Sequence, residues 1–319
     1  MDNEYWISEL TDDDVPAVVS LCRTALDLPE DAAEAAEIVL RLRESTGTDG
    51  WAAHPRRLAG FVAVVPAPAS VSGGRVVGAV LGSISHRDQS IGHIDLIAVD
   101  PPERRRGIGR ALMSRVEGAL AGLGAGEVVI DGNAPYYAWP GVDVRYTPAI
   151  CAVTAFGFAK DDSAWNMTAN LSGDRPRSTE SDERQLADKG ITVRRAGLDD
   201  VPALVEFVLT NFGSGWAGEI VHSVGREHAG CYLAIDAAGA FLGFAAYGSS
   251  RPSWFGPMGT APAARGLGIG SVLLRRCLAD QKAAGHERVQ IGWVGPLPFY
   301  SSAVGARVER VFMLYRKQL

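Results

Sequence analysis

The sequence is poor in cysteine and has no long apolar run. Its four cysteines lie far apart and include no C-x-x-C pair, so we predict neither a disulfide framework nor a metal site. No uncharged apolar stretch approaches the roughly 18 residues that a membrane-spanning helix needs. The N-terminal segment MDNEYWISEL is acidic and lacks the apolar core of a secretory signal. We therefore expect a cytoplasmic protein with reduced thiols that does not enter the membrane.

An excess of basic residues is also absent. The 31 Lys and Arg residues are outnumbered by 37 Asp and Glu residues, which gives a formal net charge of −6. This balance argues against nucleic acid as a partner and mildly favours a cationic substrate. With 47% hydrophobic and 21% charged residues, the composition is that of a globular protein. A chain of 319 residues is long enough for two domains, each with its own core.

What the sequence does have is a glycine-rich turn that occurs twice. Residues 104–109 read RRRGIG and residues 265–270 read RGLGIG, so that both contain Arg-x-x-Gly-x-Gly. Each copy follows an apolar stretch and precedes an amphipathic helix pattern. Such a turn presents several backbone N–H groups at the positive end of a helix, an arrangement suited to a pyrophosphate.

Two known nucleotide-binding motifs do not fit this turn. The glycine spacing differs from the G-x-G-x-x-G fingerprint of dinucleotide-binding folds, and no Lys-Ser/Thr pair follows as in a P-loop. For either copy by itself, the alternative is a strand-to-helix turn in which glycine only permits tight packing. The occurrence of the turn in equivalent places of both halves favours a binding role.

The turn belongs to a longer internal repeat. Residues 11–18 (TDDDVPAV) resemble residues 197–204 (GLDDVPAL), and in both a predicted strand runs into an acidic helix start with Pro in its first turn. The first half carries extra residues before its glycine turn, partly in a predicted loop over 66–74. The polar segment 173–189 is predicted to be a linker, so that we expect domains over 1–172 and 190–319.

Both halves show the same order of predicted elements. In each, a strand and helices precede three adjacent strands, the glycine turn, a helix, a strand, a helix and a last strand. Three adjacent strands do not fit a run of βαβ units, so we expect an α/β (α+β) fold with a mixed, mostly antiparallel sheet flanked by helices. The predicted strands before and after each glycine turn are 60–65, 76–85, 93–99 and 127–131, and 231–236, 241–248, 254–260 and 288–293.

With these elements in place, the chain resembles the GNAT acetyltransferases in both halves. Residues 94–112 (IDLIAVDPPERRRGIGRAL) are similar to the acetyl-CoA motif of that family over its full length. Residues 258–270 (MGTAPAARGLGIG) are a second, slightly less typical copy. The resemblance implies two tandem GNAT domains and acetyl-CoA as the acetyl donor.

The resemblance also implies which residues bind the donor. In that family the strand before the turn leaves its neighbour, and its backbone pairs with the pantetheine arm while the turn amides hold the pyrophosphate. Nearby arginines add positive charge. In the first half these residues are Ile97, Ala98, Val99, Arg104, Arg105, Arg106, Gly107, Ile108, Gly109 and Arg110. In the second half they are Met258, Gly259, Thr260, Arg265, Gly266, Leu267, Gly268, Ile269, Gly270 and Ser271.

A catalytic residue is suggested only in the second half. GNAT enzymes often supply a proton to the departing thiolate from a Tyr near the start of the helix after the fifth strand. Tyr300, in the segment FYSSAVGA, fits that position with one extra residue and is the predicted general acid; a packed tyrosine is the alternative. Counting back from Gly157 places Val153 there in the first half, and valine cannot donate a proton. Nearby substitutes for it would be Tyr136, Tyr137 or Tyr146.

A general base is harder to assign. Asp95 and Asp131 lie on the fourth and fifth strands of the first half, whereas their counterparts are Gly256 and Gly292. Many enzymes of this class deprotonate the amine through water, so a missing carboxylate is tolerated. Two acidic residues remain as alternatives in the second half: Glu219 and Asp236.

The sequence thus predicts an N-acetyltransferase that uses acetyl-CoA and acts on a primary amine of a small molecule, such as an amino sugar or an aminoglycoside. The second half is expected to be catalytic, and the first half to bind acetyl-CoA without turnover or to act as a scaffold. Two alternatives stay open: a non-catalytic acyl-CoA-binding or regulatory protein, and a protein-lysine acetyltransferase.

Overall fold

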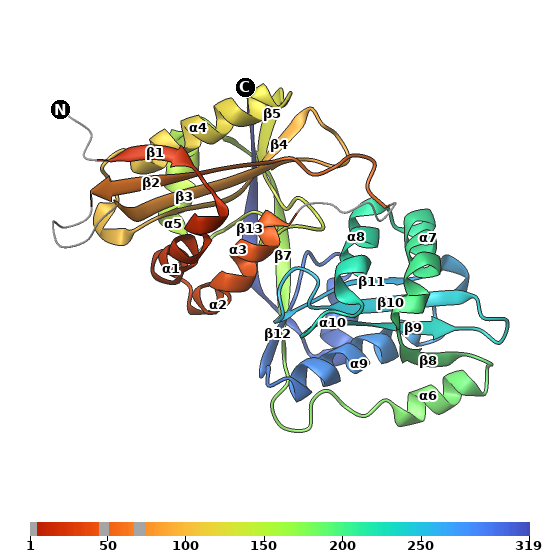
Figure 1. The fold of residues 1–319 in the computed structure, drawn as a ribbon. Coiled ribbons are helices and arrows are strands. Elements are labelled where there is room, and N and C mark those ends of the chain that lie inside the picture. The colour runs from red at the N-terminus through yellow and green to blue at the C-terminus, as the bar shows by residue number, and fades with distance from the viewer. Residues whose placement is uncertain (1–4, 45–50, 67–73) are drawn as a thin grey trace. The chain divides into compact units, whose positions relative to one another are not determined.

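The structure is a computed structural model that describes residues 5–44, 51–66 and 74–319. Most of the loop expected at 66–74 falls outside these residues. The chain forms two compact units (Figure 1). The first unit consists of Met1–Ser163 together with Phe312–Leu319, and the second of Ala164–Val311.

The first unit contains most of the elements of the first half. Its strands and helices are β1 (Trp6–Glu9), α1 (Val15–Ala25), α2 (Pro29–Ala33), α3 (Ala35–Arg43), β2 (Leu58–Pro66), β3 (Gly74–Ile84), β4 (Ile91–Val99), α4 (Ile108–Gly122), β5 (Glu127–Ile130), β6 (Val142–Asp143), α5 (Thr147–Ala155) and the start of β7 (Ala159–Asn170). Strands β1 to β4 are antiparallel neighbours, while β4 and β5 are parallel. The helix start at Val15 has Pro in its first turn, as predicted.

Alternating side chains place two apolar layers on the faces of this sheet. Phe61 and Ala63 of β2 pack in a core cluster with Ile108, Leu112 and other residues of α4. The intervening Val62 and Val64 belong to a separate cluster with residues of α1 and α3. The sheet is therefore covered by α4 on one face and by α1 and α3 on the other, which Figure 1 shows.

The second unit repeats this arrangement. Its elements are the end of β7, α6 (Glu180–Ala187), β8 (Thr192–Arg195), α7 (Val201–Asn211), α8 (Ser214–Ser223), β9 (Gly230–Ile235), β10 (Phe241–Tyr247), β11 (Trp254–Thr260), α9 (Ile269–Ala283), β12 (Arg288–Ile291), α10 (Leu297–Val304) and the start of β13 (Arg307–Gln318). Strands β8 to β11 are antiparallel, and β11 and β12 are parallel. Helix α9 packs on one face of the sheet. Helices α7 and α8 contact Phe244 of β10 through the rings of Phe207 and Trp216.

Two long strands, β7 and β13, are each divided between the units (Figure 1). In the second unit, residues 167–170 of β7 pair with β12 although they come from the first half of the sequence. In the first unit, residues 315–318 of β13 pair with β5 although they end the chain. Each unit thus contains a strand segment from the other half. For this reason the units divide the chain at points other than those predicted at 172 and 190.

The segment predicted to be a linker contains helix α6. Leu186 is buried in the core cluster of the second unit, and Arg276 of α9 forms an ion pair with Glu183 at 2.5 Å. Arg275 forms a further ion pair with Asp182. Packing and charge thus attach α6 to the second unit.

Candidate functional site

The two glycine turns have nearly the same backbone. Gly107 and Gly268 are the residues before α4 and α9, and both are left-handed, with φ of 87° and 88°. Two residues earlier, Arg105 has a φ of 68° where Gly266 has 82°. A left-handed conformation costs a side-chain-bearing residue about 1 kcal/mol, so that Arg105 holds a strained backbone that glycine would adopt freely. The shape of the turn is therefore preserved even where its glycine is not.

Both turns expose backbone donors at a helix N-terminus. The first helical hydrogen bond runs from Ala111 N to Gly107 O at 3.0 Å, and its counterpart from Val272 N to Gly268 O at 3.4 Å. The N–H groups ahead of these donors lie in the first turn, where a helix offers them no acceptor of its own. The three residues before each of these helices are exposed, while Ile108 and Ile269 are buried and anchor the helix start. This geometry suits an anion such as a pyrophosphate.

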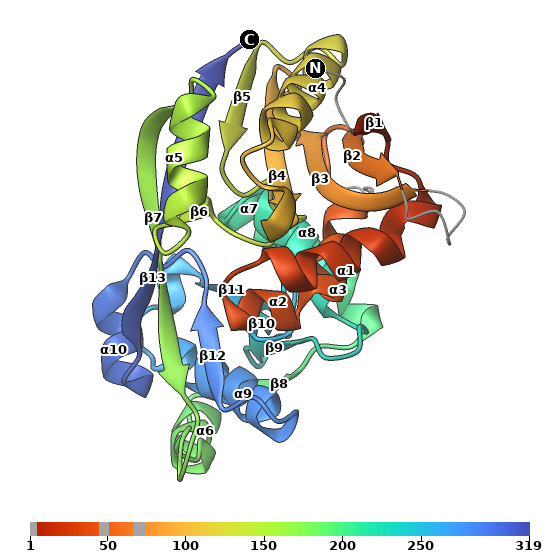
Figure 2. The same cartoon turned by 90° about the vertical axis from the view of Figure 1, so that its left-hand side faces the viewer.

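The strand before each turn separates from its parallel neighbour. Pairing of β4 with β5 ends at His93 and Val129, and pairing of β11 with β12 ends at Phe255 and Ile291. The two strands of the first unit can be followed in Figure 2. Past these points no strand among the described residues pairs with that side of residues 97–99 or 258–260, although Arg104 Nε donates to the Val99 carbonyl.

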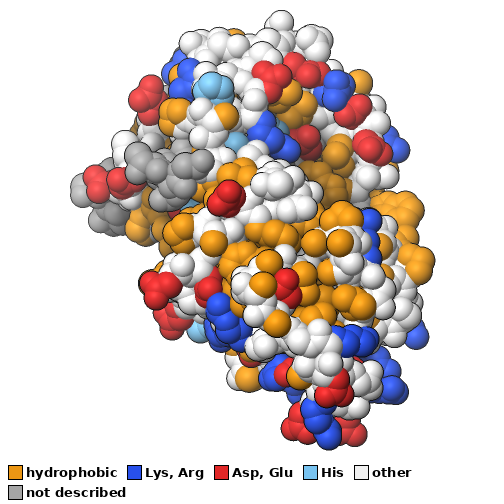
Figure 3. Space-filling view, turned by 90° about the vertical axis from the view of Figure 1, so that its right-hand side faces the viewer, with side chains coloured by type: hydrophobic (Ala, Val, Ile, Leu, Met, Phe, Trp, Pro, Cys, Tyr) orange, Lys and Arg blue, Asp and Glu red, His pale blue; other side chains and the backbone are white. Residues whose placement is uncertain are grey.

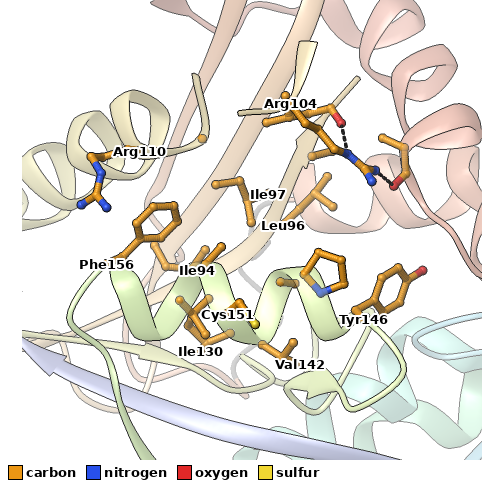
Figure 4. Close-up of a pocket in the computed structure, with 18 of the residues that line it drawn as sticks. Ile94, Leu96, Ile97, Arg104, Arg110, Ile130, Val142, Tyr146, Cys151 and Phe156 are labelled. Carbon is orange, nitrogen blue, oxygen red and sulfur yellow. Dashed lines mark hydrogen bonds between the residues drawn. The ribbon is translucent and has the colours of Figure 1, made fainter. Parts of the chain in front are cut away.

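A cavity of about 590 Å³ lies in the first unit beside the glycine turn (Figure 4). Its walls are mainly apolar and come from β4, the turn, α4 and α5. Figure 4 shows Leu96 and Ile97 of β4 on one side, and Cys151 of α5 and the following Phe156 on the other. The predicted residues that line it are Ile97, Ala98, Val99, Arg104, Arg105, Gly107, Ile108, Gly109 and Arg110. A cavity of this volume and lining is typical of a site for a small organic ligand.

Arg104 connects the ends of β4 and α1 beside this cavity. Its Nε donates to the Val99 carbonyl at 3.1 Å and its Nη2 to the Ala25 carbonyl at 2.9 Å, as the dashed lines of Figure 4 show. Asp27 also lies 3.3 Å from Nη2. The guanidinium therefore caps the end of α1 and ties it to the end of β4.

The other arginines of the first turn differ in their contacts. Arg106 forms an ion pair with Glu103. Arg110 lies over the ring of Phe156, 5.3 Å from its centroid, and donates to the Ala155 carbonyl. Arg105 is exposed and lines the cavity. Arg105 and Arg110 are thus the arginines best placed to add charge at its mouth.

In the second unit the corresponding region is more closely packed. A Cβ atom on Gly270 would lie 3.4 Å from the ring of Phe299 and 3.7 Å from the Met258 side chain. A Cβ atom on Gly109, which is the corresponding residue of the first unit, would lie 3.8 Å from its nearest neighbours. Gly259 faces the ring of Phe212, which would lie within 2.5 Å of an added Cβ, so only glycine fits there. Arg265, Gly266, Leu267 and Gly268 are exposed, and Thr260, Gly270 and Ser271 are half-buried.

Tyr300 and Val153 occupy equivalent positions. Each is the buried residue of its helix, α10 or α5. At the end of each helix a backbone hydrogen bond returns to this residue, from Phe158 N to Val153 O and, one residue further along, from Ala306 N to Tyr300 O. Tyr300 packs edge-on against Phe255 of β11 with ring centroids 6.2 Å apart. Burial raises the pKa of Tyr300 to about 12, so the hydroxyl keeps its proton in the neutral range.

The acidic residues considered in the first half differ in their surroundings. Asp95 is buried and forms an ion pair with Arg56, with 3.0 Å between Oδ2 and Nη2. Burial raises the pKa of the Asp95 carboxyl, although the charge of Arg56 opposes this effect. Asp131 is about one-third exposed, and its Oδ1 lies 2.7 Å from His93 Nδ1. Both carboxylates line a smaller cavity of about 40 Å³.

The other candidates are engaged elsewhere. Tyr146 lines the large cavity, but its hydroxyl donates to the buried Asp31 at 3.0 Å. The ring of Tyr136 lies under Arg56, and Tyr137 lines the smaller cavity. In the second half, Glu219 is buried in α8, and Asp236 accepts the N–H groups of its own turn, from Ala238 and Ala240.

Sequence reasoning missed much of the cavity wall. Asp27, Trp139, Val142, Cys151 and Phe156 line the cavity but lie far from the glycine turn in sequence. The pattern carries no signal for them, because the segment between β5 and α5 is irregular. Residues 131–146 connect these elements in the first unit, whereas residues 292–296 suffice in the second.

Among the described residues, no helix is long and apolar enough to cross a membrane. Across the same part of the chain, no group of three or more His, Cys, Asp and Glu side chains is arranged to hold a metal ion. On the face shown in Figure 3, acidic and basic side chains are interspersed with hydrophobic ones.

Comparison with known proteins matches both halves of the chain. A family model described as the acetyltransferase (GNAT) family matches residues 30–137 and 202–297. These two regions contain the two glycine turns. No curated protein sequence matches the chain at a significant level.

Solved structures with the same fold include proteins of similar length. A tandem GNAT protein from the clavulanic acid biosynthesis pathway is 18% identical, with a TM-score of 0.64 and 98% of both chains covered. A GCN5-related N-acetyltransferase from Sphaerobacter thermophilus is also 18% identical, with a TM-score of 0.63, covering 100% of this chain and 96% of that one. At these identities the likeness shows the fold alone.

A third similar structure belongs to a larger protein. It is described as a GCN5-related glucosamine N-acetyltransferase region of a fungal multi-domain GH3 β-N-acetylglucosaminidase. The TM-score is 0.72 at 18% identity, and the match covers 98% of this chain. The chain spans only 38% of the length of that protein.

Proposed function

The chain belongs to the acetyltransferase (GNAT) family and carries two GNAT regions, and from this membership we propose that it is an acetyl-CoA-dependent N-acetyltransferase acting on a primary amine of a small molecule. An amino sugar or an aminoglycoside is the acceptor class that we favour. The observation that carries the proposal is the left-handed glycine turn at a helix N-terminus, repeated with φ of 87° and 88°. In the first unit it borders a cavity large enough for a small organic ligand.

The residues of the first unit fit acetyl-CoA part by part. The N–H groups at the start of α4 suit its pyrophosphate, and the backbone of residues 97 and 98, which β5 does not pair with, suits the pantetheine arm. The apolar walls formed by Ile94, Ile97 and α5 suit the arm itself. Bound there, acetyl-CoA would supply an activated acetyl group. The matching backbone of residues 258–260 and 265–271 supports a second site in the other unit.

We further propose that Tyr300 donates a proton to the departing sulfur in the second unit. Its burial against Phe255 of β11 places it beside the strand that leaves β12. A pKa of about 12 keeps the hydroxyl protonated at neutral pH, which a proton donor requires. Val153 at the equivalent position supports an unequal role for the two halves.

The test combines turnover with the number of acetyl-CoA molecules bound per chain. Release of CoA is followed over a panel that includes glucosamine, an aminoglycoside and a lysine peptide, and binding is measured by calorimetry. Gly268→Leu is expected to abolish turnover, while Gly107→Leu mainly lowers the binding stoichiometry. Loss of turnover only with Gly107→Leu would assign catalysis to the first half instead.

The panel also separates the alternative functions. Binding of acetyl-CoA without CoA release from any amine would contradict the enzyme proposal and favour a non-catalytic acyl-CoA-binding protein. Acetylation of the lysine peptide but of no small amine would favour a protein-lysine acetyltransferase. Melting curves of both variants confirm that each remains folded.

A further inference from the structure

The inner end of the large cavity lies beyond the glycine turn, where β4 and β5 separate. Pairing of the two strands stops at His93 and Val129, and the next residues, Ile94 and Ile130, both line the cavity. A CoA thioester whose pyrophosphate binds at the start of α4, and whose arm follows β4 back from residue 98, would bring its acyl group to this end. The side chains at this end therefore determine which acyl groups fit.

Several of these side chains are aliphatic in the first unit and aromatic in the second. Three positions differ in this way: Ile94, Ala152 and Val153 correspond to Phe255, Phe299 and Tyr300. The alignment of β4 with β11 follows from counting back from the left-handed glycines before α4 and α9. The alignment of α5 with α10 follows from the one buried residue of each helix. At all three positions the first unit lacks a ring that the second unit has.

In the second unit the three rings pack against one another and against the start of α9. Tyr300 lies edge-on to Phe255 and to Phe299, with ring centroids 6.2 Å and 5.0 Å apart. A Cβ atom on Gly270 would lie 3.4 Å from the ring of Phe299. The rings thus occupy space beside β11 that an acyl chain longer than acetyl would need.

In the first unit the corresponding space belongs to the cavity. Ile94, Ala152 and Val153 all line the volume of about 590 Å³, and Ile130 and Val142 lie beside them at this end (Figure 4). Ile94, Ile130 and Val153 belong to one core cluster, against which Val142 packs. The inner end of the cavity is therefore an apolar wall held in place by the core, which favours an apolar group.

Two carboxylates also line this end of the cavity, and each already has a guanidinium partner. Asp95 Oδ2 lies 3.0 Å from Arg56 Nη2, and Asp143 Oδ2 lies 3.0 Å from Arg145 Nη2. Both acidic side chains are almost fully buried. An apolar chain bound here would therefore not deprive an exposed carboxylate of its water.

We propose that the first half selects a CoA thioester whose linear acyl chain is longer than acetyl, such as a hexanoyl group. Ala152 and Val153 are its specificity-determining residues, because their small side chains leave open the space that Phe299 and Tyr300 fill in the second unit. Each further methylene group that is buried raises the affinity roughly fourfold. The inference rests on the proposed function for the CoA site and adds the acyl group that the first half binds there.

The experiment measures the binding of CoA, acetyl-CoA and hexanoyl-CoA to the full chain by calorimetry. Hexanoyl-CoA should bind at least about tenfold more tightly than acetyl-CoA, because its additional methylene groups are buried. Ala152→Phe and Val153→Tyr introduce the side chains of the second unit, and each should remove most of that difference while CoA itself still binds. Thr154→Phe adds the same ring at an exposed position of the same helix, away from the cavity lining, so it should bind all three ligands as the unchanged protein does.

Equal affinity of hexanoyl-CoA and acetyl-CoA for the unchanged protein would overturn the inference without any variant. A preference for hexanoyl-CoA that persists in folded Ala152→Phe or folded Val153→Tyr would also overturn it, because the chain would then bind outside this cavity. If the preference depends on these residues but no amine is acetylated, the acyl site stands and the proposed function fails. If amines are acetylated and hexanoyl-CoA binds no better than acetyl-CoA, the function stands and the acyl site is wrong.

Discussion

Tyr315 of β13 pairs with Ile130 of β5, so a residue near the end of the chain completes the core of the first unit. Met167 of β7 has the reverse relationship, because it pairs with Ile291 of β12 and lies in the core of the second unit. Both side chains are almost fully buried. Each half of the sequence thus supplies apolar contacts that stabilise the unit formed mainly by the other half.

We predict that Tyr315→Ala destabilises the first unit by about 3 kcal/mol, because a buried aromatic side chain is replaced by a methyl group. Met167→Ala should cost the second unit a similar amount. Hydrogen exchange followed by mass spectrometry would locate each effect. Tyr315→Ala should speed exchange in β2 to β5, and Met167→Ala in β9 to β12.

The strands in which hydrogen exchange becomes faster show whether β13 pairs with β5. If Tyr315→Ala speeds exchange only in β9 to β12, the pairing of β13 with β5 is wrong. Val308, which is exposed on the same strand, offers a control, since Val308→Ala removes little buried surface.

The two glycines of the first turn should respond differently to alanine. Gly107→Ala places a side chain at a φ of 87° and is expected to cost about 1 kcal/mol of stability. Gly109 lies in α4, where an added Cβ meets only ordinary contacts at 3.8 Å, so Gly109→Ala should keep or slightly raise stability. Because Gly109 lines the cavity, its methyl group should weaken CoA binding. Melting curves and CoA titrations of both variants check these outcomes, and a stable Gly109→Ala protein with unchanged CoA affinity would contradict the assignment of the turn.

The pH dependence of turnover tests Tyr300. A proton donor is lost as the pH rises through its pKa, and burial raises that pKa to about 12. We therefore expect no loss of kcat from tyrosine ionisation between about pH 8 and pH 10. Tyr300→Phe should lower kcat about 100-fold across that range. A variant with unchanged kcat for every accepted amine would show that Tyr300 is only a packed tyrosine.

The buried pair of Asp95 and Arg56 should matter for stability. Asp95→Asn would leave the buried Arg56 guanidinium without its carboxylate, at a cost of about 3 kcal/mol. Asp131→Asn should cost much less, because the Asp131 side chain is about one-third exposed. Urea unfolding of the two variants gives the comparison, and equal losses would show that the two carboxylates are equivalent.

Much of each half could be predicted from the sequence, because its patterns are local. The strands before and after each glycine turn follow from apolar runs, and the helix starts at Val15 and Val201 follow from Asp and Pro. The predicted fold class and the GNAT family are confirmed by the structure and the family model. The turn itself is local too, since a left-handed residue at a helix start favours glycine.

The cavity wall and the strand exchange could not be predicted in this way. Phe156 and Trp139 meet β4 only after the segment that follows β5 has folded back over it. Residues 312–319 read as an ordinary last strand of the second half, and nothing in their alternation says which sheet they complete. Strand pairing depends on backbone hydrogen bonds, which are the same for any sequence of this type.

The sequence by itself therefore determined the two repeated halves, the family and the glycine turns, because these depend on residues close together in the chain. Only the tertiary structure decided that Tyr315 and Met167 stabilise opposite units, that Arg104 caps α1, and that Asp131 lies beside His93. These features arise from contacts between distant segments. Which segments meet is set by the packing of the whole core rather than by any local pattern.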